Sequence, residues 1–306
     1  MGVTKNLRAS VRTKYNEIMT STEMQELATL VLTYACKVLN SAFALSFIGA
    51  LAGAAAGGLA AQRVIEKSKL REESLKEIRN THSAVMVAFS ICNTALLLKK
   101  QLVQPMFDRF SEAHTGFIKY REERASGKGQ SNGPYHFQLD MQEYMAPALA
   151  TETLKGLVFD KVNAFGRPLL LVAQIENTAN GLAGTIAKRA RLIEDFKTIP
   201  REPEVLAFQY FGEKMPSGHT HREYADIVEV IHSYTNDLIF FSGLLASDLA
   251  AHGKSRQEAF LRKFGKGAPV IEPPDFSGPK KSGLYPPDSE YSALLKWVVD
   301  KAVVPQ

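Results

Sequence analysis

Cysteine is scarce in this chain, with only Cys36 and Cys92 among 306 residues. The two form no Cys-x-x-Cys pair, and no further cysteine or histidine completes a zinc-ligand spacing around either of them. The sequence therefore gives no sign of a redox pair or a cysteine-based zinc site. We predict that both residues are buried, reduced thiols, because free cysteine is among the most frequently buried residue types.

The chain also lacks the motifs of common enzyme classes. The Gly-x-Ser-x-Gly signature is absent, and Gly127-Lys128-Gly129 lacks the rest of a phosphate-binding loop. No compact basic stripe is interleaved with aromatic residues, so a net charge of +5 does not predict a nucleic-acid partner. We expect no cofactor, and the sequence leans towards a protein that is not an enzyme.

The most enzyme-like feature is the pair His219 and His221, which are weak candidates for metal ligands. Two histidines two positions apart share a metal when the backbone is extended, and Glu223, Asp226 or His232 are available to complete such a set. The same stretch, Thr220 to Glu223, matches the capping box of a helix start. The capping interpretation is favoured over metal binding.

Against these absences stands a long run without charge, from Val38 to Gln62. It exceeds the roughly 20 residues that cross the hydrocarbon core of a bilayer. Its strongly apolar members favour insertion by roughly 2–5 kcal/mol, a modest margin. We predict a transmembrane helix over 38–62. The alternative is an Ala/Gly-rich helix buried in a soluble bundle.

Gly49, Gly53 and Gly57 form one stripe within this run, a glycine zipper. Each glycine costs about 1 kcal/mol in a helix in water, which counts against the soluble alternative. Small residues at every fourth position let two membrane helices approach closely. The stripe predicts helix packing and self-association within the membrane.

Basic residues follow the run closely: Arg63, Lys67, Lys69 and Arg71. Before it only Lys37 is near, so the positive-inside rule places the C-terminal side in the cytoplasm. The same four residues are candidates for contact with lipid headgroups. We therefore expect a single-pass protein of the cell membrane, with the bilayer as its partner.

The remainder indicates an all-α fold, a bundle of long antiparallel helices. Heptad-like spacing begins at Ile78, and the charge-free stretch 83–98 is a bundle helix or, alternatively, a short second membrane element. Pro105 is expected to kink or break that helix. We divide the chain into a short N-terminal segment, the transmembrane helix, juxtamembrane and first bundle helices, a loop, a helical bundle, and an extended strap with a terminal helix: 1–37, 38–62, 63–124, 125–147, 148–267 and 268–306.

Within the bundle, the clearest stripe runs from Ile227 to Leu249, on a helix expected to end at Gly253 and to be followed by a shorter one. An earlier helical region is expected to be interrupted at Gly166 and Pro168, and again near Asn180-Gly181. The segment 135–141 is predicted to be extended or a short strand. The Pro/Gly-rich strap precedes a last helix over 289–304, with Trp297 as its anchor.

Three hypotheses for function follow. The first is a membrane-anchored helical protein whose cytoplasmic domain contacts an unknown protein partner or signals. The second is a membrane-active effector that forms a pore or disrupts the bilayer through the glycine zipper. The third is a metal-dependent enzyme using His219 and His221.

Overall fold

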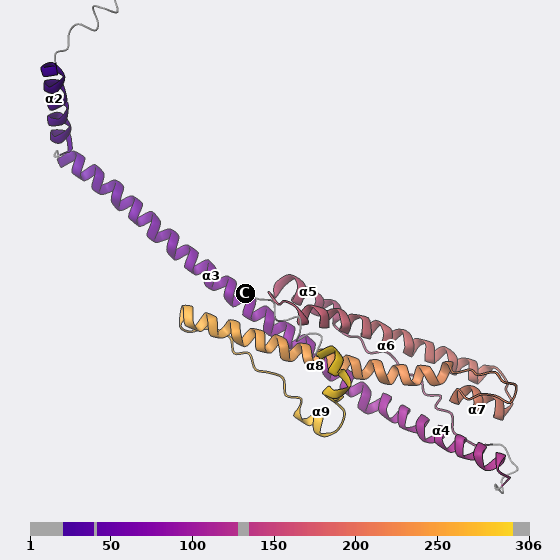
Figure 1. Ribbon diagram of the computed structural model, residues 1–306. Helices are drawn as coiled ribbons and strands as arrows, with labels where there is room; N and C mark the ends of the chain where they lie inside the picture. Colours follow the sequence, from indigo (N-terminus) through magenta and orange to yellow (C-terminus); the bar gives the residue numbers. More distant parts are fainter. Residues whose placement is uncertain (1–20, 40–41, 128–134, 296–306) are drawn as a thin grey trace, which may run out of the picture. The chain divides into compact units, whose positions relative to one another are not determined.

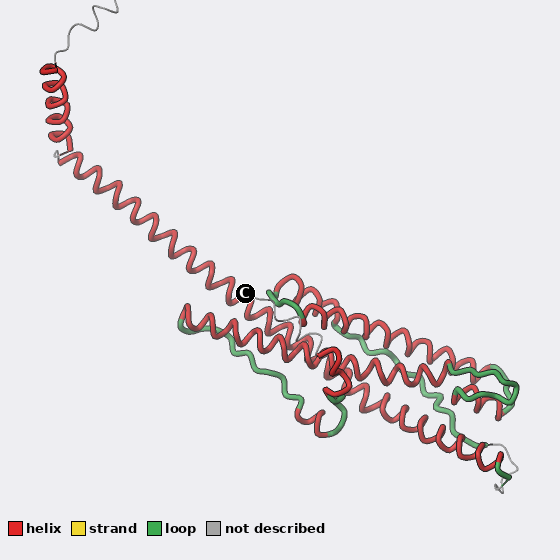
Figure 2. Tube along the Cα trace, viewed as in Figure 1, coloured by secondary structure: helices red, strands yellow, loops and turns green. Residues whose placement is uncertain are grey.

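The computed structural model describes residues 21–39, 42–127 and 135–295, and every element in these ranges is helical (Figures 1 and 2). The all-α prediction is therefore confirmed for them. The α-helices are α2 (Ser21–Leu39), α3 (Ala42–Leu98), α4 (Gln104–Ala125), α5 (Thr151–Lys161), α6 (Arg167–Thr198), α7 (Pro203–Phe211), α8 (Glu223–Phe264) and α9 (Ser277–Lys281). A π-helical turn, η1 (Lys99–Val103), joins α3 to α4, and a 3₁₀ turn, η2 (Asp288–Tyr291), lies near the C-terminus.

The chain divides into two compact units, Met1–Leu70 and Arg71–Gln306. In the first unit the structure describes α2 and the beginning of α3. The predicted transmembrane helix 38–62 falls on the end of α2 and the beginning of α3, and residues 40–41 lie outside the described residues. The second unit holds the hydrophobic core and is described first.

Helix α8 is antiparallel to both of its long neighbours in the second unit. Against α3, Cys92 Sγ lies 3.5 Å from the Ile239 carbonyl oxygen, whereas the earlier Glu77 pairs with the later Arg256 at 3.0 Å. Against α6, Lys188 pairs with Glu223 at 2.9 Å, and earlier α6 residues meet later α8 residues in the same way. The core is thus a bundle of three long helices, with α5 packed on α6 and α7 on α8.

The apolar stripe predicted on α8 is buried, with Leu238 and Leu245 completely inaccessible. The prediction that this helix ends at Gly253 is wrong, because α8 continues to Phe264. A Cβ at Gly253 would lie 3.0 Å from Thr81 Cγ2 and would collide with Ile271 Cδ1. The glycine therefore permits close packing within the helix and does not end it.

Helix α6 is likewise continuous through Asn180-Gly181, where a break had been considered. A Cβ at Gly181 would lie 2.8 Å from Cζ of Tyr234 on α8, so this glycine also makes room for a neighbour. The interruption predicted at Gly166 and Pro168 is confirmed. Gly166 has φ of +68° between α5 and α6, a conformation that favours glycine.

Pro105 neither ends the helix nor leaves it unchanged. The π-helical turn immediately precedes it, and Pro105 occupies the first turn of α4. Proline has no backbone N–H and its ring crowds the carbonyl of the preceding turn, so the wider π turn absorbs the disruption and α4 continues the path of α3.

Segments without helix cover the bundle. Residues 135–150 are extended but form no strand within the described ranges, and α7 was not predicted. The predicted strap is packed against the core through Ile271, Phe276 and Tyr285. The predicted last helix begins as η2 and helical residues up to 295, and its remainder, with Trp297, lies outside the described residues.

Candidate functional site

The glycine stripe lies on the described part of α3 in the first unit. A Cβ placed at Gly49, Gly53 or Gly57 would meet no atom within 4 Å. The structure describes no helix of this chain against the stripe, so the stripe is open to another molecule. Arg63, Lys67, Lys69 and Arg71 follow on the same helix and are exposed.

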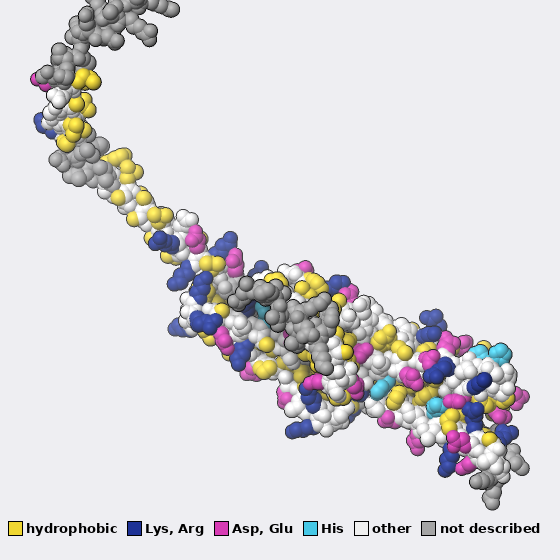
Figure 3. Space-filling view, viewed as in Figure 1, with side chains coloured by type: hydrophobic (Ala, Val, Ile, Leu, Met, Phe, Trp, Pro, Cys, Tyr) yellow, Lys and Arg dark blue, Asp and Glu magenta, His cyan; other side chains and the backbone are white. Residues whose placement is uncertain are grey.

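Apolar side chains accompany the stripe on the surface. Every described side chain from Met24 to Lys37, and from Gly49 to Glu73, is exposed. Leu51 and Leu59 each leave more than half of their surface accessible. Figure 3 shows hydrophobic side chains along α2 and the beginning of α3, whereas charged side chains cover much of the visible face of the bundle. These are the residues a bilayer or a partner helix would cover.

One helix among the described residues, Gly49–Ala125, is long and apolar enough to cross a membrane, and half of its most apolar window is buried. Since side chains from Gly49 to Glu73 are exposed, that window extends into the bundle. There Val85, Cys92 and Leu96 are buried, as expected for the bundle-helix interpretation of 83–98. A buried core helix passes the same test, so this criterion is weak evidence for a span.

The two cysteines differ in their surroundings. Cys92 is buried, as predicted, and desolvation raises the pKa of its thiol to about 12, with the nearby Ser242 hydroxyl acting weakly in the opposite direction. Cys36 is exposed, so the prediction of burial is wrong for this residue. It lies on α2, whose described side chains make no core contact.

His219 and His221 are exposed in the loop that precedes α8. The loop is closed by hydrogen bonds such as Met215 N–H to the His219 carbonyl oxygen, at 2.9 Å. Within the described ranges, no three His, Cys, Asp or Glu side chains come together to hold a metal. A helix does begin here, at Glu223, but its N-cap is Arg222 and makes no side-chain capping hydrogen bond.

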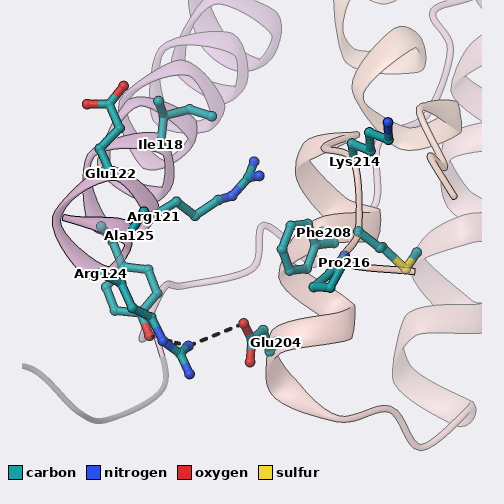
Figure 4. Close-up of a pocket in the computed structure, with 11 residues that line it drawn as sticks. Ile118, Arg121, Glu122, Arg124, Ala125, Glu204, Phe208, Lys214 and Pro216 are labelled. Atoms are coloured by element: carbon teal, nitrogen blue, oxygen red, sulfur yellow. Dashed lines mark hydrogen bonds and ion pairs between the residues drawn. The ribbon is translucent and has the colours of Figure 1, made fainter. Parts of the chain in front are cut away.

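The second unit contains a cavity of about 680 Å³ between α4, α7 and the loop before α8 (Figure 4). Arg121 points from α4 towards Phe208 on α7, with its guanidinium carbon 5.0 Å from the ring centroid. It donates to Glu213 Oε2 at 2.8 Å, and His114 Nε2 lies 2.9 Å from the other oxygen of that carboxylate. Across the cavity floor, Arg124 reaches Glu204 at 3.2 Å.

This cavity is suited to contact rather than to catalysis. Its lining residues include no cysteine, serine, threonine or histidine that would supply a nucleophile or a general base. Arg121 and Arg124 are partly neutralised by their glutamates, and Lys214 adds a further positive charge at the rim. A surface of this kind is able to bind a complementary polar segment with both signs of charge.

A buried arginine organises the neighbouring face. Arg189 of α6 is 1% exposed and donates to the carbonyl oxygens of Gln142, at 2.7 Å, and Asp140, at 3.1 Å. Its guanidinium also lies 4.4 Å from the Tyr144 ring centroid. Arg189 thereby fixes the extended segment 135–150 to the bundle.

Asp140 completes this cluster. Burial alone would raise the pKa of its carboxyl group, but the hydrogen bond from Arg109, the Gln142 backbone N–H and the charge of Arg189 outweigh burial and lower it. Burial, aided by Asp140, raises the pKa of Tyr144 to about 12. The groups are held in one charge state near neutral pH, which is the behaviour of a structural clamp rather than a proton-transfer site.

Sequence reasoning missed both clusters. Arg121, Glu204 and Glu213 lie on separate segments, and their pairing is non-local. For Arg189 there was a signal, since it takes a position in the buried stripe of α6 between Ile186 and Ile193. Comparison with protein families, with curated proteins and with solved structures found no match, so function is argued from this chain alone.

Proposed function

We propose that the chain is a membrane-anchored helical protein in which the apolar beginning of α3 crosses the bilayer and the bundle of the second unit contacts other proteins in the cytoplasm. One observation carries the proposal. The described side chains around the glycine stripe are exposed, although they include large apolar residues such as Phe47, Leu51 and Leu59.

The energetic argument is direct. Removing a leucine or phenylalanine side chain from water contributes about 1.5–3 kcal/mol relative to leaving it exposed. Phe47, Leu51 and Leu59 receive no such contribution from the described part of this chain. The apolar helical residues from Ala42 to Gln62 number roughly the 20 needed to cross the hydrocarbon core. A bilayer supplies the missing burial along the whole segment.

The glycine stripe supports self-association of this span. Without a close partner, glycines in a helix lose about 1 kcal/mol each relative to alanine. A second copy packed against Gly49, Gly53 and Gly57 would recover part of this cost through close backbone contact. The exposed Arg63, Lys67, Lys69 and Arg71 would then lie at the cytoplasmic headgroups.

Cys36 and Cys92 provide a test of topology in the unmodified chain. A membrane-impermeant maleimide applied to intact cells should label Cys36, which is exposed before the proposed span. Cys92 should remain silent, because it is buried. In a Cys36→Ser background, Ser217→Cys should react only after the membrane is permeabilised. Labelling of Ser217→Cys in intact cells would overturn the orientation, and release of the protein by carbonate washing would overturn the span.

Self-association is tested by Gly53→Leu, which places a bulky side chain on the stripe. Ala55→Leu is the matched control, since residue 55 lies on roughly the opposite side of α3. Crosslinking in detergent should show fewer oligomers for Gly53→Leu and an unchanged distribution for Ala55→Leu. Equal crosslinking in both variants would refute the role of the stripe. Depolarisation of cells that express the wild-type chain would instead support a membrane-active assembly.

A further inference from the structure

Helix α2 has two distinct faces. Met24, Leu27, Val31 and Tyr34 recur at intervals of three and four residues and are about 60% exposed or more. This spacing gathers them on one side of the helix. The described structure places nothing against that side.

The opposite face is polar but carries little charge. Gln25, Thr29 and Thr33 lie there, and both threonine hydroxyls donate to carbonyl oxygens one turn earlier in α2. Cys36 continues the same face at the next turn. Glu26 and Lys37 contribute opposite charges at the two ends of the described side chains.

Helix α2 is too short in apolar length to cross a membrane by itself. Its charge-free stretch, from Leu27 to Cys36, covers about half of the roughly 20 residues required. Apolar stretches of this length are typical of core helices or interfacial segments. The described residues offer α2 no core, which leaves the interfacial alternative.

The position of α2 in the chain selects its partner. It ends at Leu39, and α3, whose beginning is the proposed span, starts at Ala42. Consecutive Cα atoms are at most about 3.8 Å apart, so the end of α2 is tied within roughly 11 Å of the span. If α3 crosses the bilayer, the end of α2 is therefore held at the bilayer surface.

We infer that α2 lies in the plane of the membrane, with Met24, Leu27, Val31 and Tyr34 among the acyl chains and Thr29, Thr33 and Cys36 facing water. This inference rests on the proposed function, since the span provides the tether. The nearly uncharged polar face means that apolar area, rather than attraction to anionic lipids, holds the helix there. Together α2 and the span form a bent anchor on one side of the membrane.

Spin labels test the inference in the full chain, reconstituted in phosphatidylcholine vesicles in a Cys36→Ser background. Single cysteines at Leu27, Val31 and Thr33 report collisions with oxygen, which concentrates in lipid, and with a water-soluble nickel chelate. A label at Leu51 reports on the proposed span. We expect a severalfold higher oxygen-to-nickel ratio at Leu27 and Val31 than at Thr33, unchanged when anionic lipid is added.

The outcomes separate the inference from the proposed function. Lipid exposure at Leu51 with water exposure at all three α2 positions would overturn the inference and leave the span intact. Lipid exposure at Thr33 as well would mean that α2 enters the hydrocarbon core, and shielding of Leu27 and Val31 from both reagents would mean a protein partner. Either result also overturns the inference. Water exposure at Leu51 would overturn the proposed function itself.

A matched pair of variants gives an independent readout. Val31→Glu places a charge on the apolar face, and Thr29→Glu places the same charge on the polar face. In the Val31→Glu chain, the Leu27 label should become as accessible to nickel as the Thr33 label, while the protein stays in the membrane. The Thr29→Glu chain should behave as the parent. Equal effects of the two charges would contradict the assignment of faces.

Discussion

Two glycines of α6, three residues apart, should respond oppositely to the same substitution. Gly184 is exposed, and a Cβ there would meet no atom within 4 Å. Gly181 faces α8, and its Cβ would lie 2.8 Å from Cζ and 2.9 Å from Cε2 of Tyr234. Both substitutions gain the same helix propensity, about 1 kcal/mol for Gly→Ala. Gly184→Ala should therefore stabilise the bundle by up to that amount.

Gly181→Ala gains the same propensity but loses more through crowding. Forcing a methyl group into a filled space costs about 1–3 kcal/mol, so the net effect ranges from neutral to about 2 kcal/mol destabilising. The difference between the two variants is more secure than either value, because the propensity term cancels. At about 2–4 °C per kcal/mol for a domain of this size, the two melting temperatures should differ by roughly 2–12 °C.

Thermal unfolding of the full chain in detergent, followed by circular dichroism, measures this difference. Tyr234→Leu provides the internal control, since it removes the ring that Gly181 accommodates. In that background Gly181→Ala should lose most of its penalty relative to Gly184→Ala, and a double-mutant cycle gives the coupling. Equal stabilisation by Gly181→Ala and Gly184→Ala in the wild-type background would refute the close approach of α6 and α8.

Three further predictions concern the second unit. Leu238→Ala, at an inaccessible position of α8, should lower the free energy of unfolding in urea by about 2–5 kcal/mol. Cys92 should resist maleimide in the folded protein and react only on unfolding, because burial raises its pKa to about 12. Burial lowers the pKa of His232, and the charge of Lys99 lowers it further, so below about pH 6.5 the unfolded chain binds a proton that the folded chain rejects. Stability should therefore fall from pH 7 to 5, and His232→Gln should reduce that slope.

Local periodicity accounts for what the sequence predicted well. The stripe of α8 and the interruption at Gly166 depend on neighbours within a few residues, and these features were found. The α8 end was misplaced because glycine at position 253 was interpreted as a stop signal. Its role depends on Thr81 and Ile271, which come from other parts of the chain. No local pattern carries that information.

The candidate site illustrates the same limit. Arg121 meets Glu213 and Arg124 meets Glu204 only after α4 and α7 come together, so the cavity has no signature in the sequence. Arg189 is the exception. A charged residue in an apolar stripe indicates a buried partner, and here the partners are backbone carbonyls of the segment 135–150. Its neighbours could not be named in advance, but its burial could.

The glycines of the chain also bear on what lies outside it. Inside the second unit, Gly181, Gly243 and Gly253 each have a neighbouring side chain where a Cβ would stand, from Tyr234, Tyr285 and Ile271 respectively. Close packing offsets the helix propensity that these glycines forgo.

Gly49, Gly53 and Gly57 forgo the same propensity, yet the described structure places no atom within 4 Å of a Cβ at any of them. If the offset seen in the bundle applies to α3, it comes from another molecule. A stripe at every fourth position matches the contact line of a second helix, whereas lipid chains would gain nothing from missing side chains. The spacing therefore favours a helix, most simply that of a second copy, as the partner of this stripe. Gly53→Leu and Ala55→Leu separate these two possibilities, because only a helical partner distinguishes one side of α3 from the other.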